Sequence, residues 1–556
     1  MIVNAIENGI FARWRNKDGK VESATIPYSE YKPRLYVEDD AVEVREMMVS
    51  DNLGKYRITL NYESDHFGNL YNLDGKPLKE VTWSPPKPSF AKVVRSFFDK
   101  RGDTTYEADV PHHHRWCVDK YALSNFPEYE MRKWYWDMEW MTVGEHEGAI
   151  TCIVRYDSYD EEYKTYVWFP EENEDISHYA SEKEMLEAFL NDIIETDPDM
   201  LISWFGWKFD LPKLIERMIE NDIDARLMSP VNEVSGVYWK QNKVTYSKRK
   251  VNSYSAVYQP IAGRICVPLD MAFERQWLDS QRGTLPSMAL DYISEEVLGD
   301  KKLVSEKFPD KNDFFARAWL EDTETYLDYA EKDVELLVRI DEQNHTVDAI
   351  IALQRLLRAP FDACFHASKM GNIYFMRNAY WKPPTGQKGD RVSYDGAMVY
   401  DPLSEGTNGL HLGVAAFDFA GLYPSMIIAR NISWETRSEE PTELVVNLRT
   451  PKDFSDVTVE DLRHFKTDKL GVLPNALLNL KGLRNDYKIR MKEAQDDSDY
   501  AKWNNNQLAV KRLMASFYGI IAFQGFGWAD VDLAACITAS AREAIREAAF
   551  IVKEME

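Results

Sequence analysis

The stretch WYWDMEW, residues 134–140, places Asp137 and Glu139 two positions apart on a predicted β-strand. Alternate residues of a strand point to the same face, so the two carboxylates lie side by side. Two acids this close repel each other unless a cation lies between them, and ligation by oxygen alone suits Mg²⁺ or Mn²⁺. For an isolated pair of acids the alternative is a solvated strand face.

Two later stretches supply further acids. LISWFGWKFDLP (201–212) places Asp210 where a buried apolar strand meets a helix, and YLDYAEKDVELL (326–337) places Tyr329 and Asp333 four residues apart on a helix. Residues i and i+4 share a helix face, so the phenol and the carboxylate can address one site. Four acids on three elements match the needs of two-metal phosphodiester hydrolysis, in which one ion activates water and the other stabilises the leaving oxygen.

This set resembles the three exonuclease motifs of proofreading DNA polymerases of the DEDD class, and Tyr329 is typical of the Tyr-containing subclass. The resemblance implies Asp137, Glu139, Asp210 and Asp333 as ligands of two ions and Tyr329 as the residue that orients the attacking water. One position departs from the family, which usually has Asn five residues before the second-motif Asp, where this chain has Phe205. That Asn is not a metal ligand, so we expect altered handling of the DNA strand with the chemistry retained.

A second candidate site begins with FDFAGLYPSMI (417–427). Taken alone, its Leu-Tyr-Pro segment favours a plain strand-to-helix turn. The stretch resembles motif A of family B DNA polymerases, with Gly421 in place of the usual Ser. The resemblance implies that Asp418 binds both catalytic magnesium ions and that Tyr423 excludes the 2'-hydroxyl of ribonucleotides.

Three cations follow on a predicted helical hairpin, 474–516. LRNDYKIR carries Arg484 and Lys488, and VKRLMASFYG carries Lys511. Such fixed cations can hold a triphosphate, although each taken singly is equally consistent with solvated surface. The hairpin resembles the fingers of family B polymerases, in which Tyr518 and Gly519 fit the motif and Ala515 replaces the usual Asn, a change expected to weaken minor-groove or nucleotide contacts.

Composition sets the remaining bounds. At about 150 residues per domain, 556 residues predict three or four domains. No apolar run approaches the ~20 residues of a membrane span. Five cysteines without a CxxC pair argue against a zinc module. The N-terminus lacks an export signal, so we expect a cytosolic protein without a membrane partner. The net charge of −25 taken alone disfavours nucleic acid, but WKQNKVTYSKRKV (239–251) concentrates five cations, either as a basic edge or as a solvated hairpin.

Together with the pattern of predicted strands and helices, the resemblance implies a multidomain α/β and α+β fold. It would have a mostly β N-terminal domain, an RNase H-like 3'-5' exonuclease domain, and a partial palm with helical-hairpin fingers. YDGAMVYDP (394–402), read as a strand, resembles the family's link between the proofreading and synthesis sites. The predicted boundaries are 1–130 for the β-rich domain, 131–345 for the exonuclease, 346–390 for a helical connector, 391–473 for the first part of the palm, 474–521 for the fingers and 522–556 for a further palm helix.

Motif C of family B, Y-x-D-T-D-S, which carries the second palm aspartate, is absent, and so is the thumb. WADVDLAA (528–535) offers Asp530 and Asp532, but these acids are better placed to cap the helix that follows. We therefore expect the larger piece of a split family B polymerase, closest in character to phage and viral members. Its partners would be primer-template DNA, dNTPs, a C-terminal polypeptide with motif C and thumb, and a sliding clamp. A shortened polymerase, a stand-alone 3'-5' exonuclease and a non-catalytic DNA-binding subunit are the alternatives.

Overall fold

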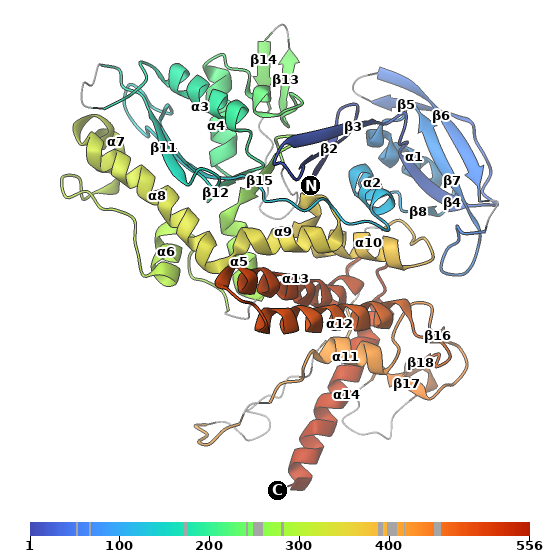
Figure 1. The fold of residues 1–556 in the computed structure, drawn as a ribbon. Helices are drawn as coiled ribbons and strands as arrows, with labels where there is room; N and C mark the ends of the chain where they lie inside the picture. Colours follow the sequence, from blue (N-terminus) through green and yellow to red (C-terminus); the bar gives the residue numbers. More distant parts are fainter. Residues whose placement is uncertain are drawn as a thin grey trace. The chain divides into compact units, whose positions relative to one another are not determined.

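The computed structural model describes residues 1–556 except 52–53, 66–67, 172–175, 241–242, 248–258, 280–282, 387–392, 397, 399–408, 416, 450–457 and 556. The chain forms two compact units, each built from two segments that are far apart in sequence (Figure 1). The first unit contains Met1–Glu30 and Leu123–Phe365, and the second contains Tyr31–Ala122 and His366–Glu556. No helix in the described ranges is long and apolar enough to cross a membrane.

The first unit opens with a small antiparallel sheet in the order β1 (Ile2–Ile6), β2 (Gly9–Arg15) and β3 (Val21–Pro27). Its middle strand is buried at almost every position and carries Arg13, which is only 1% exposed. The Arg13 guanidinium pairs with Asp197 at 3.0 Å and with Asp199 at 3.3 Å. Arg15 adds a bond from Nε to Asp199 at 2.7 Å and one to the Asp197 carbonyl, also at 2.7 Å.

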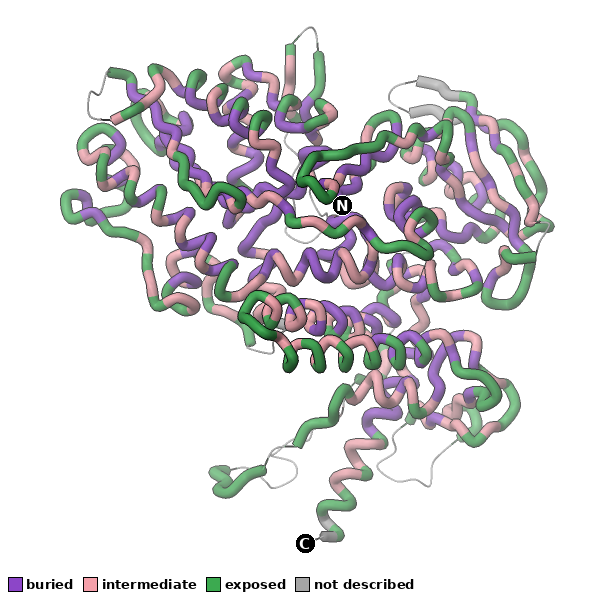
Figure 2. The backbone as a smooth tube through the Cα atoms, in the orientation of Figure 1, coloured by how far each residue is buried: buried purple, intermediate pink, exposed green. Residues whose placement is uncertain are grey.

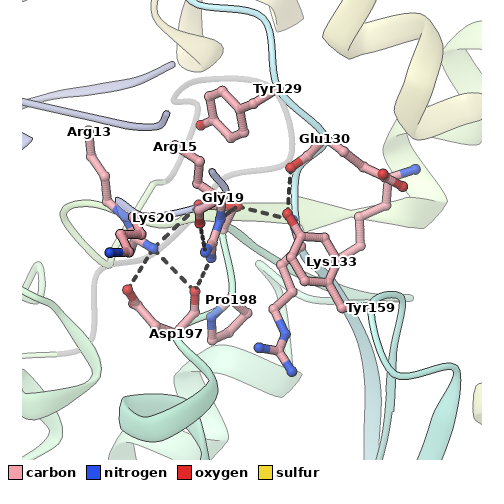
Figure 3. A network of polar contacts seen from close by, with 12 residues as sticks. Arg13, Arg15, Gly19, Lys20, Tyr129, Glu130, Lys133, Tyr159, Asp197 and Pro198 are labelled. Atoms are coloured by element: carbon pink, nitrogen blue, oxygen red, sulfur yellow. Dashed lines mark hydrogen bonds and ion pairs between the residues drawn. The ribbon is translucent and has the colours of Figure 1, made fainter. Parts of the chain in front are cut away.

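The contacts of Arg13 and Arg15 with Asp197 belong to the polar network that Figure 3 shows. Buried charges are tolerated only when they are paired, so the network ties the N-terminal sheet to the segment that contains Asp197 and Asp199. Residues 1–30 are thus part of the first unit, whereas the sequence suggested one N-terminal domain over 1–130. The finer six-domain division stays a prediction.

The centre of the first unit is a five-stranded sheet in the order β11-β10-β9-β12-β15. In this sheet β10 runs antiparallel to β9 and β11, while β12 runs parallel to β9 and β15. This mixed sheet agrees with the predicted RNase H-like exonuclease domain. The strands are β9 (Lys133–Trp140), β10 (Ile150–Asp157), β11 (Glu162–Val167), β12 (Met200–Ser203) and β15 (Ile265–Pro268).

Alternation along β9 decides which helix meets which face. The rings of Trp134 and Trp136 lie 6.0 Å from Phe189 of α3 (Glu182–Thr196). Tyr135, which points the other way, donates its hydroxyl to Asp341 of α8 (Thr323–Asn344). The two helices therefore cover opposite faces of the sheet, and Asp137 and Glu139, in step with Tyr135, face α8.

The other elements of the first unit surround this sheet. A two-stranded hairpin, β13 and β14, agrees with part of the predicted strand-turn-strand; Lys248, Arg249 and Lys250 lie outside the described residues. These elements are β13 (Val237–Lys240), β14 (Lys243–Tyr246), α4 (Asp210–Glu220), α5 (Leu269–Asp279), α6 (Leu290–Leu298), α7 (Lys311–Glu321), α9 (Thr346–Leu357), η2 (Ala225–Met228) and η3 (Phe361–Phe365).

The second unit begins with a five-stranded sheet in the order β5-β6-β7-β4-β8. Its core contains Leu35, Ile58, Val81 and Trp83 from the strands and Phe98 from α1. This β-rich core agrees with the predicted N-terminal fold class. The elements are β4 (Arg34–Glu38), β5 (Glu46–Asp51), β6 (Gly54–Ser64), β7 (Leu78–Ser84), β8 (Thr105–Tyr106), η1 (Pro88–Phe90), α1 (Ala91–Asp99) and α2 (His112–Lys120).

The C-terminal part of the second unit is mostly helical. The predicted hairpin is present as α12 (Val472–Lys492) and α13 (Asp497–Ile521), joined by residues 493–496, and it extends beyond both ends of the predicted range 474–516. The strand predicted at 394–402 does not form at 394–396 or 398, and its other residues lie outside the described ranges. The other elements are α10 (Ala367–Asn378), α11 (Leu422–Ala429), α14 (Val531–Met555), η5 (Val459–Asp461), β16 (Arg437–Ser438), β17 (Leu444–Asn447) and β18 (Leu462–Phe465).

Candidate active site

The first unit contains a cluster of carboxylates. One oxygen each from Asp137, Glu139 and Asp333 lie within 4.8 Å of one another. Asp137 and Glu139 come from one face of β9, and Asp333 comes from the middle of α8, which packs on that face. The structure thus brings together three acids that span almost 200 residues. Strand periodicity predicts that Asp137 and Glu139 share a face, and the resemblance to the exonuclease motifs implies that Asp333 joins them.

Asp210 joins this cluster from a third element. It is the first residue of α4 and is buried, and it accepts hydrogen bonds from the Ser203 side chain and the Phe205 backbone. The charge of Asp210 acts directly on Asp137. Burial is the largest cause of the raised pKa of Asp137, and repulsion by Asp210 is the second. The N-terminus of a helix favours a negative side chain, and that is where the fold places Asp210.

Burial and repulsion change the pKa values of the four clustered acids. Burial and then mutual repulsion raise the pKa values of Asp137 and Glu139 well above their ordinary range, and burial raises the pKa of Asp210 to about 6. Burial also raises the pKa of Asp333. Four carboxylates in one buried site are costly to ionise together unless cations are present.

Two oxygens in the cluster are available as ligands. Oδ2 of Asp210 and Oδ1 of Asp333 are buried, and neither has a hydrogen-bond partner in the structure. Orphaned buried oxygens are rare in folded proteins, and a divalent ion would satisfy both. The donor set is entirely oxygen, so the residues present fit Mg²⁺ or Mn²⁺.

Lys302 is a component of the site that the sequence analysis missed. Its ammonium donates to Asp333 and to the Tyr329 hydroxyl, the latter at 3.1 Å. Burial lowers the pKa of Lys302, but the charges of Asp333 and Asp137 outweigh the effect of burial and raise the pKa, so the ammonium stays protonated. Nothing in the run GDKKLV separates Lys302 from Lys301, which pairs with Glu295 instead. No sequence signal therefore singles it out.

Tyr329 lies one helical turn before Asp333 and is buried. Its ring packs against Phe314 at 5.1 Å and Phe315 at 5.7 Å, both on α7, which fixes the direction of its hydroxyl. Burial raises the pKa of Tyr329, so the phenol keeps its proton. Because Lys302 donates to the phenol oxygen, the hydroxyl hydrogen points elsewhere and is available to an acceptor in the site.

Phe205, the departure from the family pattern, forms an aromatic pair next to Asp210. Its ring lies 6.0 Å from Phe209, which is largely exposed, and the Lys208 ammonium lies 5.8 Å from the Phe205 centroid. An aromatic pair offers stacking surface where an Asn would offer hydrogen bonds. This agrees with altered strand handling, which stays a prediction.

The second unit holds the residues of the predicted polymerase site. Asp418 is exposed, and α11 starts just after it, at Leu422. Gly421, at the start of this helix, has a φ of +72°, a left-handed conformation that a Ser would adopt only with strain. The replacement of the family's Ser by Gly therefore has a local backbone reason.

Tyr423 stacks on Tyr518 from the fingers helix α13, with ring centroids 4.1 Å apart and an interplanar angle of 24°. The Tyr518 hydroxyl lies 3.4 Å from that of Tyr394. Arg542 of α14 fixes the segment next to Tyr394 by donating to the carbonyls of Asp395 and Gly396 at 2.7 and 2.8 Å. The stack holds the Tyr423 ring in place. Together with the Tyr394 contact, it joins α11, α13 and the segment that contains Tyr394.

The three predicted cations of the fingers lie near one another. Arg484, Lys492 and Lys511 all lower the pKa of Lys488, with Arg484 contributing most, so the four charges share one region. Arg484 is oriented by a 3.1 Å bond from Nε to Gln507 of the facing helix. Gly519 is open, since a Cβ there would meet nothing within 4 Å. This concentration of positive charge suits a polyphosphate.

Asp530 and Asp532 have structural partners. Asp530 accepts from the backbone N–H of Leu533 at 3.0 Å and pairs with Arg437 at 2.6 Å. Asp532 pairs with Arg463 at 3.0 Å. The prediction that these acids cap the last helix is confirmed for Asp530.

Comparison with known proteins places this geometry in a family. Residues 135–271 match the family described as DNA polymerase family B, exonuclease domain, and residues 368–556 match DNA polymerase family B. The chain is 28% identical over 466 residues to a DNA polymerase of Pyrococcus glycovorans and 26% identical over 468 residues to one of Thermococcus sp. (strain 9oN-7). In both cases the match covers 81% of this chain and 54% of the relative, so the chain spans about half the length of the curated relatives it matches.

The fold agrees with these matches. The family B DNA polymerase from the hyperthermophilic archaeon Pyrobaculum calidifontis has the same fold, with a TM-score of 0.71, 16% sequence identity, and coverage of 99% of this chain and 71% of that one. These relatives are archaeal, and the predicted likeness to phage and viral members stays a prediction. The chain therefore carries the exonuclease domain and polymerase-domain sequence of DNA polymerase family B.

Proposed function

We propose that this chain is the proofreading and partial synthesis portion of a DNA-directed DNA polymerase, with a complete 3'-5' exonuclease site and one half of a polymerase site. Its substrates would be primer-template DNA and dNTPs. The observation that carries the proposal is the convergence of Asp137, Glu139 and Asp333 within 4.8 Å. Asp210 completes the set through its effect on the pKa of Asp137.

In the exonuclease site, the four acids would hold two Mg²⁺ ions, or Mn²⁺, which would supply an activated water and stabilise the leaving 3'-oxygen. The chain's own residues prepare the site. Lys302 offsets part of the carboxylate charge and holds the Tyr329 oxygen at 3.1 Å. Tyr329 in turn presents its hydroxyl proton to the water or to a phosphate oxygen, which orients the attack.

Digestion of 3'-labelled single-stranded DNA tests the exonuclease. We expect Mg²⁺-dependent shortening by the wild-type chain and loss of it in the Asp137→Ala, Glu139→Ala double variant. Equal rates in the two proteins would remove the exonuclease assignment and favour a non-catalytic DNA-binding subunit. Phe205 and Ala515 are the residues that support that alternative, but neither is a ligand in the cluster.

In the polymerase half, the segment before Asp418 supports the proposal that another structural element packs against it. Leu410, Leu412 and Val414 alternate as the apolar face of a strand would, yet they are 91%, 88% and 73% exposed. Within the described residues 409–415 and 417–419 no strand forms, and Figure 2 shows this segment as exposed. Exposed apolar residues with strand periodicity are typical of an unpaired sheet segment.

We propose that palm strands carrying motif C pair with this segment and bring the second aspartate to Asp418. The Tyr423–Tyr518 stack and the fingers cations support a retained synthesis function, because a chain that only digests DNA has no need of them together. A separate C-terminal polypeptide with motif C and the thumb is the arrangement we favour, with a sliding clamp as a further partner.

Primer extension tests this arrangement. The chain is mixed with polypeptides that contain a Y-x-D-T-D-S segment and a thumb, and extension of a labelled primer is measured with Mg²⁺ and dNTPs. Synthesis that requires both components supports the split polymerase. A stand-alone exonuclease predicts digestion without synthesis in every mixture.

A further inference from the structure

A cavity of about 590 Å³ lies beside the β13–β14 hairpin in the first unit. Its walls come from β1, from the loop at 232–235, from β13 and from residues 259–262. None of the four clustered acids lines it, so it is distinct from the exonuclease site. Its volume is in the range of small-ligand and cofactor sites.

Two aromatic side chains of β13 line this cavity. Trp239 is 56% exposed and Tyr238 is 44% exposed, which is high for rings of this size. The guanidinium carbon of Arg226 lies 5.0 Å from the Trp239 ring centroid, and Asp224 fixes Arg226 through an ion pair at 2.6 Å. An aromatic ring that is oriented in this way and still open is a platform for a flat ligand.

The polar lining favours a ligand with adjacent hydrogen-bond donors. The Glu233 carboxylate accepts the Glu7 backbone N–H at 2.9 and 3.0 Å, which fixes its position. A carboxylate has about four lone-pair sites, so it can accept further bonds from a ligand. Directly after the lining residue Trp239, Lys240 is an exposed cross-strand partner of Lys243, which pairs with Asp222 at 3.5 Å. The two lysines place positive charge at this end of the hairpin.

We propose that this cavity binds a guanine nucleotide, with the base stacked on Trp239 and its edge donating to Glu233. Guanine carries two adjacent N–H donors on its Watson–Crick edge, at N1 and at the 2-amino group, and a carboxylate can accept both. Adenine, cytosine and thymine each place an acceptor next to their donor on that edge, which would face the carboxylate unfavourably. The phosphate lies toward Lys240 and Lys243. This site goes beyond the proposed exonuclease and polymerase functions.

The test is to measure nucleotide binding to the intact chain by isothermal titration calorimetry in EDTA. EDTA removes divalent ions, which prevents digestion and metal-dependent binding of phosphate. One arm compares dGMP with dAMP, and a second compares a nine-nucleotide thymidine strand with the same strand containing one guanosine. Tighter binding of dGMP than of dAMP shows that the cavity binds a free guanine nucleotide. If only the strand with one guanosine binds more tightly than the thymidine strand, the guanine comes from single-stranded DNA. Either preference supports the proposal.

Variants locate the binding. We expect Trp239→Leu to weaken guanine binding by about tenfold or more, as for loss of one stacking contact. Glu233→Gln should reduce the preference for guanine over adenine, while Tyr163→Leu, another partly exposed aromatic of this unit, changes neither. An unchanged circular dichroism spectrum and Tm show that each variant is folded, so the test does not depend on the proposed exonuclease function. Absence of guanine preference, or binding unchanged in both cavity variants, would overturn the proposal.

Discussion

The two candidate metal sites differ in how many metal-ligating side chains the described residues bring together. The exonuclease acids come from β9, α4 and α8 of one unit, and three of them approach within 4.8 Å. Asp418 is exposed, and among the described residues it belongs to no group of three metal-ligating side chains. In the first unit, paired strands and a packed helix bring the acids together. The second site lies next to an exposed segment without strand structure, which supports our proposal that another structural element completes it.

The largest effect should come from removing two acids of the organised site. In the Asp137→Ala, Glu139→Ala variant we expect single-stranded DNA digestion to fall by ~10³-fold or more, since the stabilisation that metal ions provide is several kcal/mol. The rate is measured under single-turnover conditions with Mg²⁺. Asp313→Ala with Glu321→Ala, two acids on α7, is the matched control and should keep the wild-type rate.

The next effect should come from Lys302. Lys302→Met removes the ammonium that holds Tyr329 and Asp333, and we expect digestion to slow by roughly 10²-fold, the lower range for a positioned proton-transfer system. Lys301→Met, one residue away and paired with Glu295, is the control. Because the pKa of Lys302 is raised, the wild-type ammonium stays charged at alkaline pH, so raising the pH should not reproduce the variant's defect. Equal slowing by both substitutions would contradict the assigned role.

A smaller effect is expected on the unfinished site. In a polymerase completed by a motif C polypeptide, Lys488→Ala should raise the KM for dNTPs by about tenfold or more, as for loss of one charge-assisted contact. Lys481→Ala, an exposed lysine on the same helix, should leave the KM unchanged. Single-stranded DNA digestion should be unaffected by either change, which separates the two sites. A matching loss of exonuclease activity would indicate that the fingers cations serve the other site.

The smallest effect is on stability. The pKa of Asp210 is about 6 in the fold against 3.8 ordinarily, so between about pH 4 and pH 6 the folded state binds more protons than the unfolded state. The metal-free protein therefore loses stability as pH rises through that window, and the loss is complete above it. Mg²⁺ should offset the loss, raising Tm more at pH 7.5 than at pH 5, by about 1–2 °C for each kcal/mol regained. The acid double variant should show no such difference between the two pH values.

Much of the exonuclease site follows from local periodicity. Asp137 and Glu139 are two apart on a strand and Tyr329 and Asp333 four apart on a helix, so each pair could be placed on one face from sequence alone. Their convergence depended on the resemblance to known motifs. The structure supplies the distances.

Other features have no local signature. Lys302 acquires its role from a loop that returns to α8, and its neighbour Lys301 has the same chemistry and a different environment. Arg13 and Asp199 are 186 positions apart in sequence, so the attachment of residues 1–30 to the first unit could not be foreseen from periodicity. The strand expected at 394–402 is absent in its described residues, because local pattern alone does not create a sheet partner.

The central claim is that this chain holds one working site and one incomplete site. It is tested most directly by incubating the chain alone with a labelled primer-template, Mg²⁺ and all four dNTPs, and following the length of the primer. Our account predicts progressive shortening with no extended product. Primer extension by the chain alone would contradict it.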